Sequence, residues 1–366
     1  MFFLTMSNVW NFSIFLPLTY ILFIVSLSLY LLPLFYNSNT KNTFFILSLS
    51  ESFNIFFLPC VSIIVLFSFW SSYSVSSWFG HIVYTSFQYK IVLFILFTFL
   101  LFTFLYSTVS YLSSREIFDF LIAQFNFLYW IIILFHANSF FTVIFVIEIL
   151  STLIFLLMLT SVFTSCFFYR NLDFSSHSFF ESSTPYTFIQ SILFFFWVSL
   201  LASLNLFLFI LFIYDKLFTF DWYLIEHIFF YFINVSSYKD IYILGIIWFI
   251  ILFSIFLKCG IAPFYLWKPT FFKGMSFSSL SFYITFFYFF LFIFIIQFLS
   301  SYCHELFYFF SFFSLIIIFM GLIVLLFILC ETFFIKTFLA VSSILNSLLV
   351  FLCMSVSHSS DLFFII

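Results

Sequence analysis

Two ionisable residues interrupt the long apolar stretches of this sequence, and both can bind and release a proton. Glu148 lies about ten residues from the nearer end of the apolar run 139–163, too deep for its short side chain to reach a lipid headgroup. Lys258 directly follows the apolar run 242–257. An acid and a base in separate membrane helices, each changing the proton affinity of the other, are the elements of a proton path. Glu148 and Lys258 are therefore the candidate catalytic relay.

The residues that follow Lys258 predict a break in its helix. Pro263 has no N–H, so the carbonyl of Cys259, four residues earlier, loses its helical partner, and Gly260 lowers helix stability at the same place. An open helix at membrane depth requires protein or water to cover the freed backbone groups. The alternative is a lysine that extends to the headgroups from an ordinary helix end, with Pro263 marking the exit.

Four further polar residues are possible relay members. Ser151 lies one turn after Glu148 on the same helix face and is expected to hydrogen-bond the carboxyl group. His136 stands between two apolar runs, either in a surface turn or as a proton donor to the helix of Glu148. Gln190 and Tyr288 lie inside apolar runs and form either helix–helix hydrogen bonds or relay steps. Glu148 itself has an alternative role as a protonated acid that joins two helices.

Composition places the chain among integral membrane proteins. Its 366 residues are 66% hydrophobic and 6% charged, whereas soluble domains carry about a quarter charged residues. The net charge of −3 comes without a basic cluster that would neutralise phosphates, which excludes a nucleic-acid partner. The six cysteines form no Cys-x-x-Cys pair and are expected to pack as small apolar side chains, without disulfides, iron–sulfur clusters or other metal sites.

The apolar runs predict an all-α, polytopic membrane bundle of about ten helices, the seventh broken at Gly260–Pro263. The predicted spans are 12–36, 43–70, 91–111, 117–135, 139–163, 188–213, 242–257 with a continuation past the break, 275–299, 306–329 and 337–356. The polar stretch 268–273 is predicted to be a loop, and 215–240 either a loop or a segment in the headgroup plane. We expect one membrane domain over 1–366, with N-terminal helices in 1–112 and a core in 113–366.

Four stretches in this order resemble the antiporter-like subunits of respiratory complex I. They are Ser114-Arg115-Glu116, Val146-Ile147-Glu148-Ile149-Leu150-Ser151, Lys258-Cys-Gly-Ile-Ala-Pro-Phe-Tyr-Leu-Trp267 with Pro269 and Gly274 after it, and Ile335-Lys336-Thr-Phe-Leu-Ala-Val-Ser-Ser343-Ile344. The Ala-Pro-Phe core is most similar to the NADH dehydrogenase subunit 2 branch. The resemblance covers about 115–351.

The resemblance implies a subunit of a proton-pumping NADH:ubiquinone reductase, a translocase of the respiratory electron-transport chain. The fifth-helix glutamate and seventh-helix lysine of that family correspond to Glu148 and Lys258. The NADH, FMN, iron–sulfur and ubiquinone chemistry belongs to partner subunits, so no cofactor is expected in this chain. The implied setting is the mitochondrial inner membrane, with a mitochondrially encoded, multi-pass chain that contacts lipids and the other membrane-arm subunits.

The chain also departs from the family pattern. Gln190 and Tyr288 stand where the family has lysines in its sixth and eighth helices, and Thr270 replaces an acidic residue after the break. The family fold has about fourteen helices, so we expect a separate chain to supply the C-terminal four. The alternatives are a sibling antiporter-like subunit, a subunit of a multi-subunit cation/proton antiporter, or a structural complex I subunit that no longer conducts protons.

Overall fold

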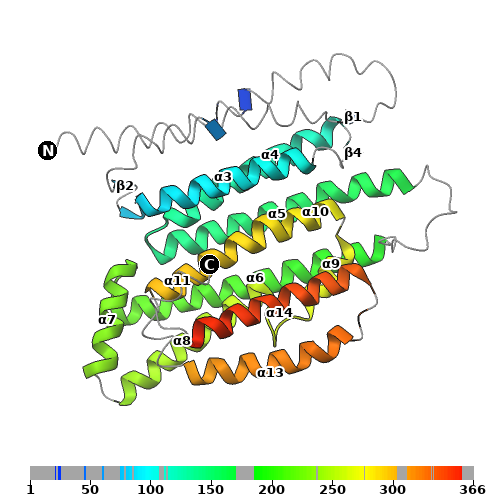
Figure 1. Ribbon diagram of the computed structural model, residues 1–366. Helices are drawn as coiled ribbons and strands as arrows, with labels where there is room; N and C mark the ends of the chain where they lie inside the picture. Colours follow the sequence, from blue (N-terminus) through cyan, green and yellow to red (C-terminus); the bar gives the residue numbers. More distant parts are fainter. Residues whose placement is uncertain are drawn as a thin grey trace, which may run out of the picture. The chain divides into compact units, whose positions relative to one another are not determined.

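The computed structural model describes most of the chain beyond residue 85. The described residues are 86–106, 114–169, 185–235, 238–275, 277–302, 311–330 and 334–356, with short pieces at 21, 24–25, 45–46, 60–61, 75–77, 80–84, 111–112 and 332. These residues are mostly α-helical (Figure 1). Their contacts divide the chain into unit 1, Met1–Asp173, and unit 2, Phe174–Ile366.

The described residues of unit 1 form packed helices and two short antiparallel strand pairs. Helix α4 packs against α5 and α3, and it also contacts β3. Strand β1 pairs with β4, and β2 pairs with β3. The bounds are β1 Phe45–Ile46, β2 Val75–Ser77, β3 Ile82–Tyr84, α3 Ser86–Tyr106, β4 Tyr111–Leu112, α4 Ser114–His136 and α5 Phe140–Tyr169.

Unit 2 is built around a short helix, α9, that lies against α6 and α14. Helix α6 also packs along α8, and α14 packs along α13, so helices cover the segment between α8 and α9. The bounds are α6 Pro185–Leu217, α7 Trp222–Val235, α8 Tyr238–Cys259, α9 Trp267–Gly274, α10 Phe277–Phe282, the π-helix η3 Tyr283–Tyr288, α11 Phe289–Tyr302, α13 Ser311–Cys330 and α14 Ile335–Val356.

Six helical stretches among the described residues are long and apolar enough to cross a membrane. They are Phe140–Leu159, Ile189–Asp215, Tyr242–Cys259, Ser279–Leu299, Ser311–Cys330 and Ile335–Cys353, and shorter apolar helices occupy Lys90–Phe102 and Ile122–His136. The predicted multi-pass α-helical membrane bundle is confirmed to this extent. Predicted spans 12–36 and 43–70 lie largely outside the described residues, so the total of ten stays a prediction.

The connection between α6 and α8 contains a helix, α7. The sequence predicts either a loop or a segment in the headgroup plane here. Its buried residues Trp222, Ile225 and Phe229 recur at helical spacing on one face. The Trp222 ring meets the Phe298 ring of α11 edge to face, with centroids 4.8 Å apart. In Figure 1, α7 runs across the direction of α6 and α8. A helix packed on one face replaces the plain loop.

Candidate functional site

The end of α8 has the hydrogen bonds of a glycine-terminated helix. Gly260 has a φ of +62°, in the left-handed region. Its N–H donates to the carbonyl of Leu257 at 3.3 Å, and the N–H of Ile261 donates to the carbonyl of Phe256 at 2.9 Å. This pair of bonds typically accompanies a left-handed residue after a helix C-terminus. Gly260 therefore turns the chain out of the helix before Pro263 is reached.

The seven residues between α8 and α9 form a tight connection that other helices approach closely. The N–H of Phe264 donates to the carbonyl of Ile261 at 2.9 Å, and the Ala262–Pro263 peptide bond is cis. A Cβ added to Gly321 of α13 would lie only 2.8 Å from the Cβ of Ala262. The glycine thus lets α13 pack directly on the connection.

The side chains packed around Gly260 also leave little space for a Cβ at this position. A Cβ at this position would lie 3.0 Å from Cζ2 of Trp267 and 3.1 Å from Cδ of Lys268. The Trp267 ring is held in turn by Phe195 and Phe271, with ring centroids 6.0 Å and 5.6 Å away. Because glycine has no Cβ, the aliphatic part of Lys268 and the Trp267 ring can pack against the end of α8.

Lys258 lies in the last turn of α8 with its side chain inside the protein. It is 7% exposed, and its Nζ donates to Oγ of Ser199 on α6 at 3.2 Å. A lysine that extends to headgroups keeps its ammonium in water; this ammonium contacts a neighbouring helix instead. A cavity of about 10 Å³ beside it is lined by Ser199 and Trp267, among others, and cavities of about this size hold a single water.

Lys268 is a site residue that the sequence analysis missed. The prediction that it belongs to a loop is wrong, because it lies in the first turn of α9, where it is 0% exposed. Its Nζ donates to the carbonyl of Cys259 at 3.3 Å and lies 3.5 Å from the centroid of the Tyr288 ring. The carbonyl that lost its helical partner is therefore bonded by a lysine nine residues further along the chain.

Burial also changes the protonation of Lys268, which lies between the candidate spans Tyr242–Cys259 and Ser279–Leu299. Removal from water penalises the ammonium more than the neutral amine and lowers the pKa of Lys268 to about 7. Its charged and neutral forms are then both accessible near neutral pH. The polar composition of 268–273 gave no signal of this burial, because the contacts come from α8 and η3.

Tyr288 closes the π-helix η3 and joins the same cluster. Its hydroxyl donates to the carbonyl of Ser343 on α14 at 3.3 Å. The wider π-turn brings residues five apart toward one face, and the rings of Tyr283 and Tyr288 stack with centroids 6.4 Å apart. The Tyr283 hydroxyl is buried without a hydrogen-bond partner among the described residues. Single π-turns inside helices frequently mark functional sites.

Gln190, the other predicted relay residue of unit 2, lies away from this cluster. Its side chain is exposed near the start of α6. It precedes Ser199 by nine residues, which is about 13 Å along a helix. Of the two polar residues that the sequence could not rank, the structure places Tyr288 beside Lys268 and Gln190 on the surface of the chain.

Glu148 belongs to unit 1, where it is half-buried in α5. The Ser151 hydroxyl donates to the backbone carbonyl of Glu148 at 2.7 Å, so the expected bond to the carboxyl group is wrong. Serine side chains within helices commonly bond the carbonyl one turn earlier. Because Lys258 lies in unit 2, the pairing of Glu148 with Lys258 stays a prediction.

His136 is the last residue of α4 and is 1% exposed, so the predicted surface turn is wrong about exposure. Its Nδ1 lies 2.7 Å from the carbonyl oxygen of Ile132. The turn after it is covered by the strand segment before α3: Asn138 donates from its backbone N–H to the carbonyl of His81 at 2.8 Å, and the His81 ring bonds Ser139. This turn is therefore bonded to a segment more than fifty residues earlier in the chain.

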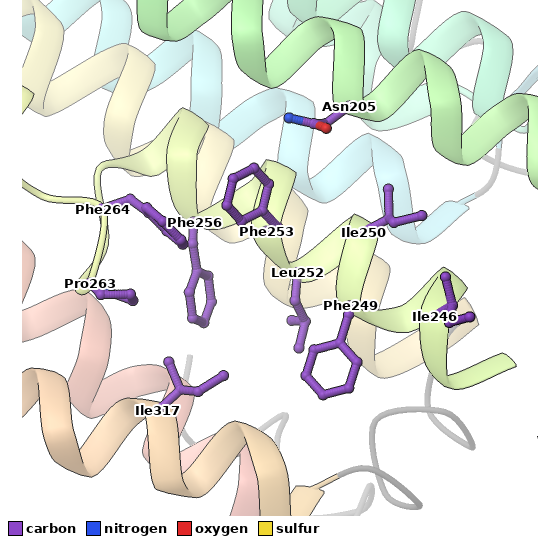
Figure 2. Close-up of a pocket in the computed structure, with 10 residues that line it drawn as sticks. All are labelled: Asn205, Ile246, Phe249, Ile250, Leu252, Phe253, Phe256, Pro263, Phe264 and Ile317. Atoms are coloured by element: carbon purple, nitrogen blue, oxygen red, sulfur yellow. The ribbon is translucent and has the colours of Figure 1, made fainter. Parts of the chain in front are cut away.

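A second concavity lies along α8, as Figure 2 shows, and it differs in character from the lysine cluster. This groove of about 440 Å³ runs between α8, the connection at Pro263 and Ile317 of α13. Asn205 of α6 is its polar lining residue, next to rings such as that of Phe253. With an apolar lining and no titratable side chain, the groove does not offer proton chemistry.

Among the described residues, no group of three His, Cys, Asp or Glu side chains could hold a metal ion. The cysteines at 60, 259, 330 and 353 are free. The site in unit 2 therefore consists of two buried amines, hydroxyl groups and a helix end. In comparisons with known proteins, no family model and no curated protein matches this chain.

Proposed function

We propose that this chain is a proton-translocating membrane-arm subunit of respiratory NADH:ubiquinone oxidoreductase, complex I, in the mitochondrial inner membrane. Protons pass through a relay that includes Glu148 and Lys258, coupled to redox reactions in other subunits. Those partner subunits bind NADH, FMN, the iron–sulfur clusters and ubiquinone. The proposal draws on the four motif stretches that resemble the antiporter-like family and on the surroundings of Lys258.

The observation that carries the proposal is the position of the Lys258 ammonium. It lies inside the protein at the C-terminal end of α8, 3.2 Å from Ser199 Oγ. The negative end of the helix dipole and the hydroxyl group favour the charged amine, whereas burial favours the neutral one. Opposing effects of this kind suit a group that must gain and lose a proton in each cycle.

In the proposed arrangement, α8 supplies the seventh of ten spans, and that span is interrupted at Gly260–Pro263. The break exposes backbone groups beside Lys258, where a polar path can form without contact with lipid. Glu148 on α5 acts as the second proton-binding group, and its charge changes the proton affinity of Lys258.

Replacement of Lys258 by methionine tests this function. Lys258→Met keeps the length of the side chain but cannot bind a proton, so we expect NADH-driven proton pumping by the assembled complex to fall about tenfold or more. Pumping would be followed with a pH-sensitive dye in sealed membrane vesicles, alongside NADH oxidation. Lys273→Met is the matched control, because Lys273 is exposed on the neighbouring helix α9; it should pump normally.

A structural subunit that no longer conducts protons is the second candidate. It is favoured by Tyr288, whose hydroxyl donates to a backbone carbonyl and carries no exchangeable charge, and by the exposed position of Gln190. Intact pumping in an assembled Lys258→Met complex would establish this alternative. A sibling antiporter-like subunit or a cation/proton antiporter subunit would be identified by the membrane proteins that co-purify with the chain.

A further inference from the structure

A second buried amine stands on the other side of the helix break. Lys258 precedes Cys259 in the chain, and Lys268 reaches back across the break to bond the carbonyl of Cys259 at 3.3 Å. Two lysines are therefore buried at the two ends of this segment, Lys258 in the last turn of α8 and Lys268 in the first turn of α9.

We propose that Lys268 is a second proton-carrying amine of this site, coupled to Lys258 across the break. This inference rests on the proposed proton-translocating function and adds a relay group that neither composition nor motif indicated. A proton held by one lysine lowers the proton affinity of the other, because like charges in a poorly solvated site repel each other.

The partners of Lys268 hold the amine without neutralising its charge. Among the described residues, its ammonium contacts a carbonyl oxygen and the face of the Tyr288 ring, and both groups are uncharged. An aromatic face attracts a cation through its quadrupole at this distance. A buried lysine paired with a carboxylate would be held charged, whereas these neutral partners leave its proton free to depart.

Hydroxyl groups on both sides of the two lysines can pass a proton between them. The small cavity beside Lys258 is lined by Ser199 and by Trp267, the residue before Lys268. On the other side, the Tyr288 ring orients the amine, and its hydroxyl is fixed on Ser343 of α14. In the proposed step, the Lys258 ammonium breaks one N–H bond, a hydroxyl or water passes the proton, and the neutral Lys268 amine forms one N–H bond.

The competing explanation is that Lys268 only closes the end of α8, where the last carbonyls lack helical partners. Two substitutions separate the explanations. Lys268→Gln keeps a neutral N–H donor for the Cys259 carbonyl, and Lys268→Arg keeps both a donor and a permanent charge. Either variant can close the helix end, but neither can alternate between a charged and a neutral form.

The experiment measures NADH-driven proton pumping and NADH oxidation in membrane vesicles that contain the assembled complex. We expect Lys268→Gln and Lys268→Arg each to lower pumping about tenfold or more, because neither side chain can pass on a proton, while the amount of assembled complex on native gels is unchanged. Lys273→Gln, five residues further on α9 and exposed, should pump normally. If the larger arginine prevents assembly, Lys268→Gln alone tests the role of Lys268, because the glutamine side chain is smaller than that of lysine.

The outcomes distinguish this inference from the proposed function. Normal pumping in Lys268→Gln together with a loss in Lys258→Met would overturn the role of Lys268 and leave the proposed function standing. Normal pumping in Lys258→Met would overturn the proposed function itself. Loss in both lysine variants, with Lys273→Gln unaffected, supports two coupled amines. Loss of assembly in Lys268→Gln would assign Lys268 to the helix end alone and so contradict the proposal.

Discussion

At the scale of single residues, the site consists of amines held by neutral oxygen atoms and aromatic rings. Ser199 and the carbonyl of Cys259 each accept a hydrogen bond from a buried lysine. Hydrogen bonds to a charged donor contribute about 1.5–3 kcal/mol, more than bonds between neutral groups. The proton affinities of the two lysines thus depend on contacts that single substitutions can remove.

Ser199→Ala tests the contact at Lys258. Loss of the hydroxyl acceptor removes one hydrogen bond that holds the Lys258 ammonium, so we expect the initial rate of proton pumping to fall. Initial pumping rates in vesicles, normalised to assembled complex, would show this loss. Ser203→Ala is the control, since the Ser203 hydroxyl donates to the Leu200 carbonyl of its own helix. Equal pumping rates for Ser199→Ala and wild type would show that proton transfer does not depend on this bond.

At the scale of elements, two irregular turns create the cluster. Gly260 ends α8 in a left-handed conformation, and η3 turns Tyr283 and Tyr288 toward one another. An uninterrupted α-helix at either place would rotate the following side chains away from Lys268. The short helix α9 then presents its lysine to both irregular elements.

Gly260→Ala should destabilise the protein by about 1–2 kcal/mol, the cost of a left-handed residue that carries a Cβ. Gly260→Asn separates two causes, because asparagine tolerates this conformation better but still places a Cβ against Trp267 and Lys268. The thermal midpoint of the purified assembly measures both variants. If Gly260→Asn is as stable as wild type, backbone strain explains the whole loss of stability in Gly260→Ala. If Gly260→Asn is as unstable as Gly260→Ala, the close contacts of the Cβ explain it.

At the scale of the whole molecule, the proposed proton-binding groups belong to two different units of the chain. Glu148 lies in unit 1, and Lys258 and Lys268 lie in unit 2. Because coupling between groups that act together is strongly non-additive, it can be measured without knowledge of the distance between them.

We therefore expect the double variant Glu148→Gln/Lys258→Met to pump no less than the worse of its two single variants. Once one group of a coupled pair is lost, removal of the other has little further effect. Initial pumping rates in vesicles, normalised to assembled complex, give the comparison. Glu148→Gln/Lys273→Met is the control and should match Glu148→Gln alone. Losses that multiply in the double variant would show two independent groups.

Local chemistry made part of this protein predictable. Apolar runs long enough to cross a bilayer predicted the helices, because hydrocarbon allows no unpaired backbone groups. The glycine and proline after Lys258 predicted where its helix would stop and which carbonyl would lose its partner. The apolar helices and the end of α8 depend on residues within a few positions of one another, so composition and spacing are enough to predict them.

Contacts between distant segments decided the rest. Lys268 and His136 both stand in polar stretches that resemble surface turns, yet both are buried. The Lys268 ammonium lies over the Tyr288 ring of η3, and the turn after His136 bonds the segment before α3. The hydroxyl of Ser151 bonds a backbone carbonyl where a carboxyl was expected. The sequence by itself determined a helical protein with apolar stretches long enough to span a membrane and a lysine at the end of one helix. Only the tertiary structure decided that a second lysine, Lys268, is buried and bonded to the carbonyl at the end of the same helix, because burial depends on which helices pack together.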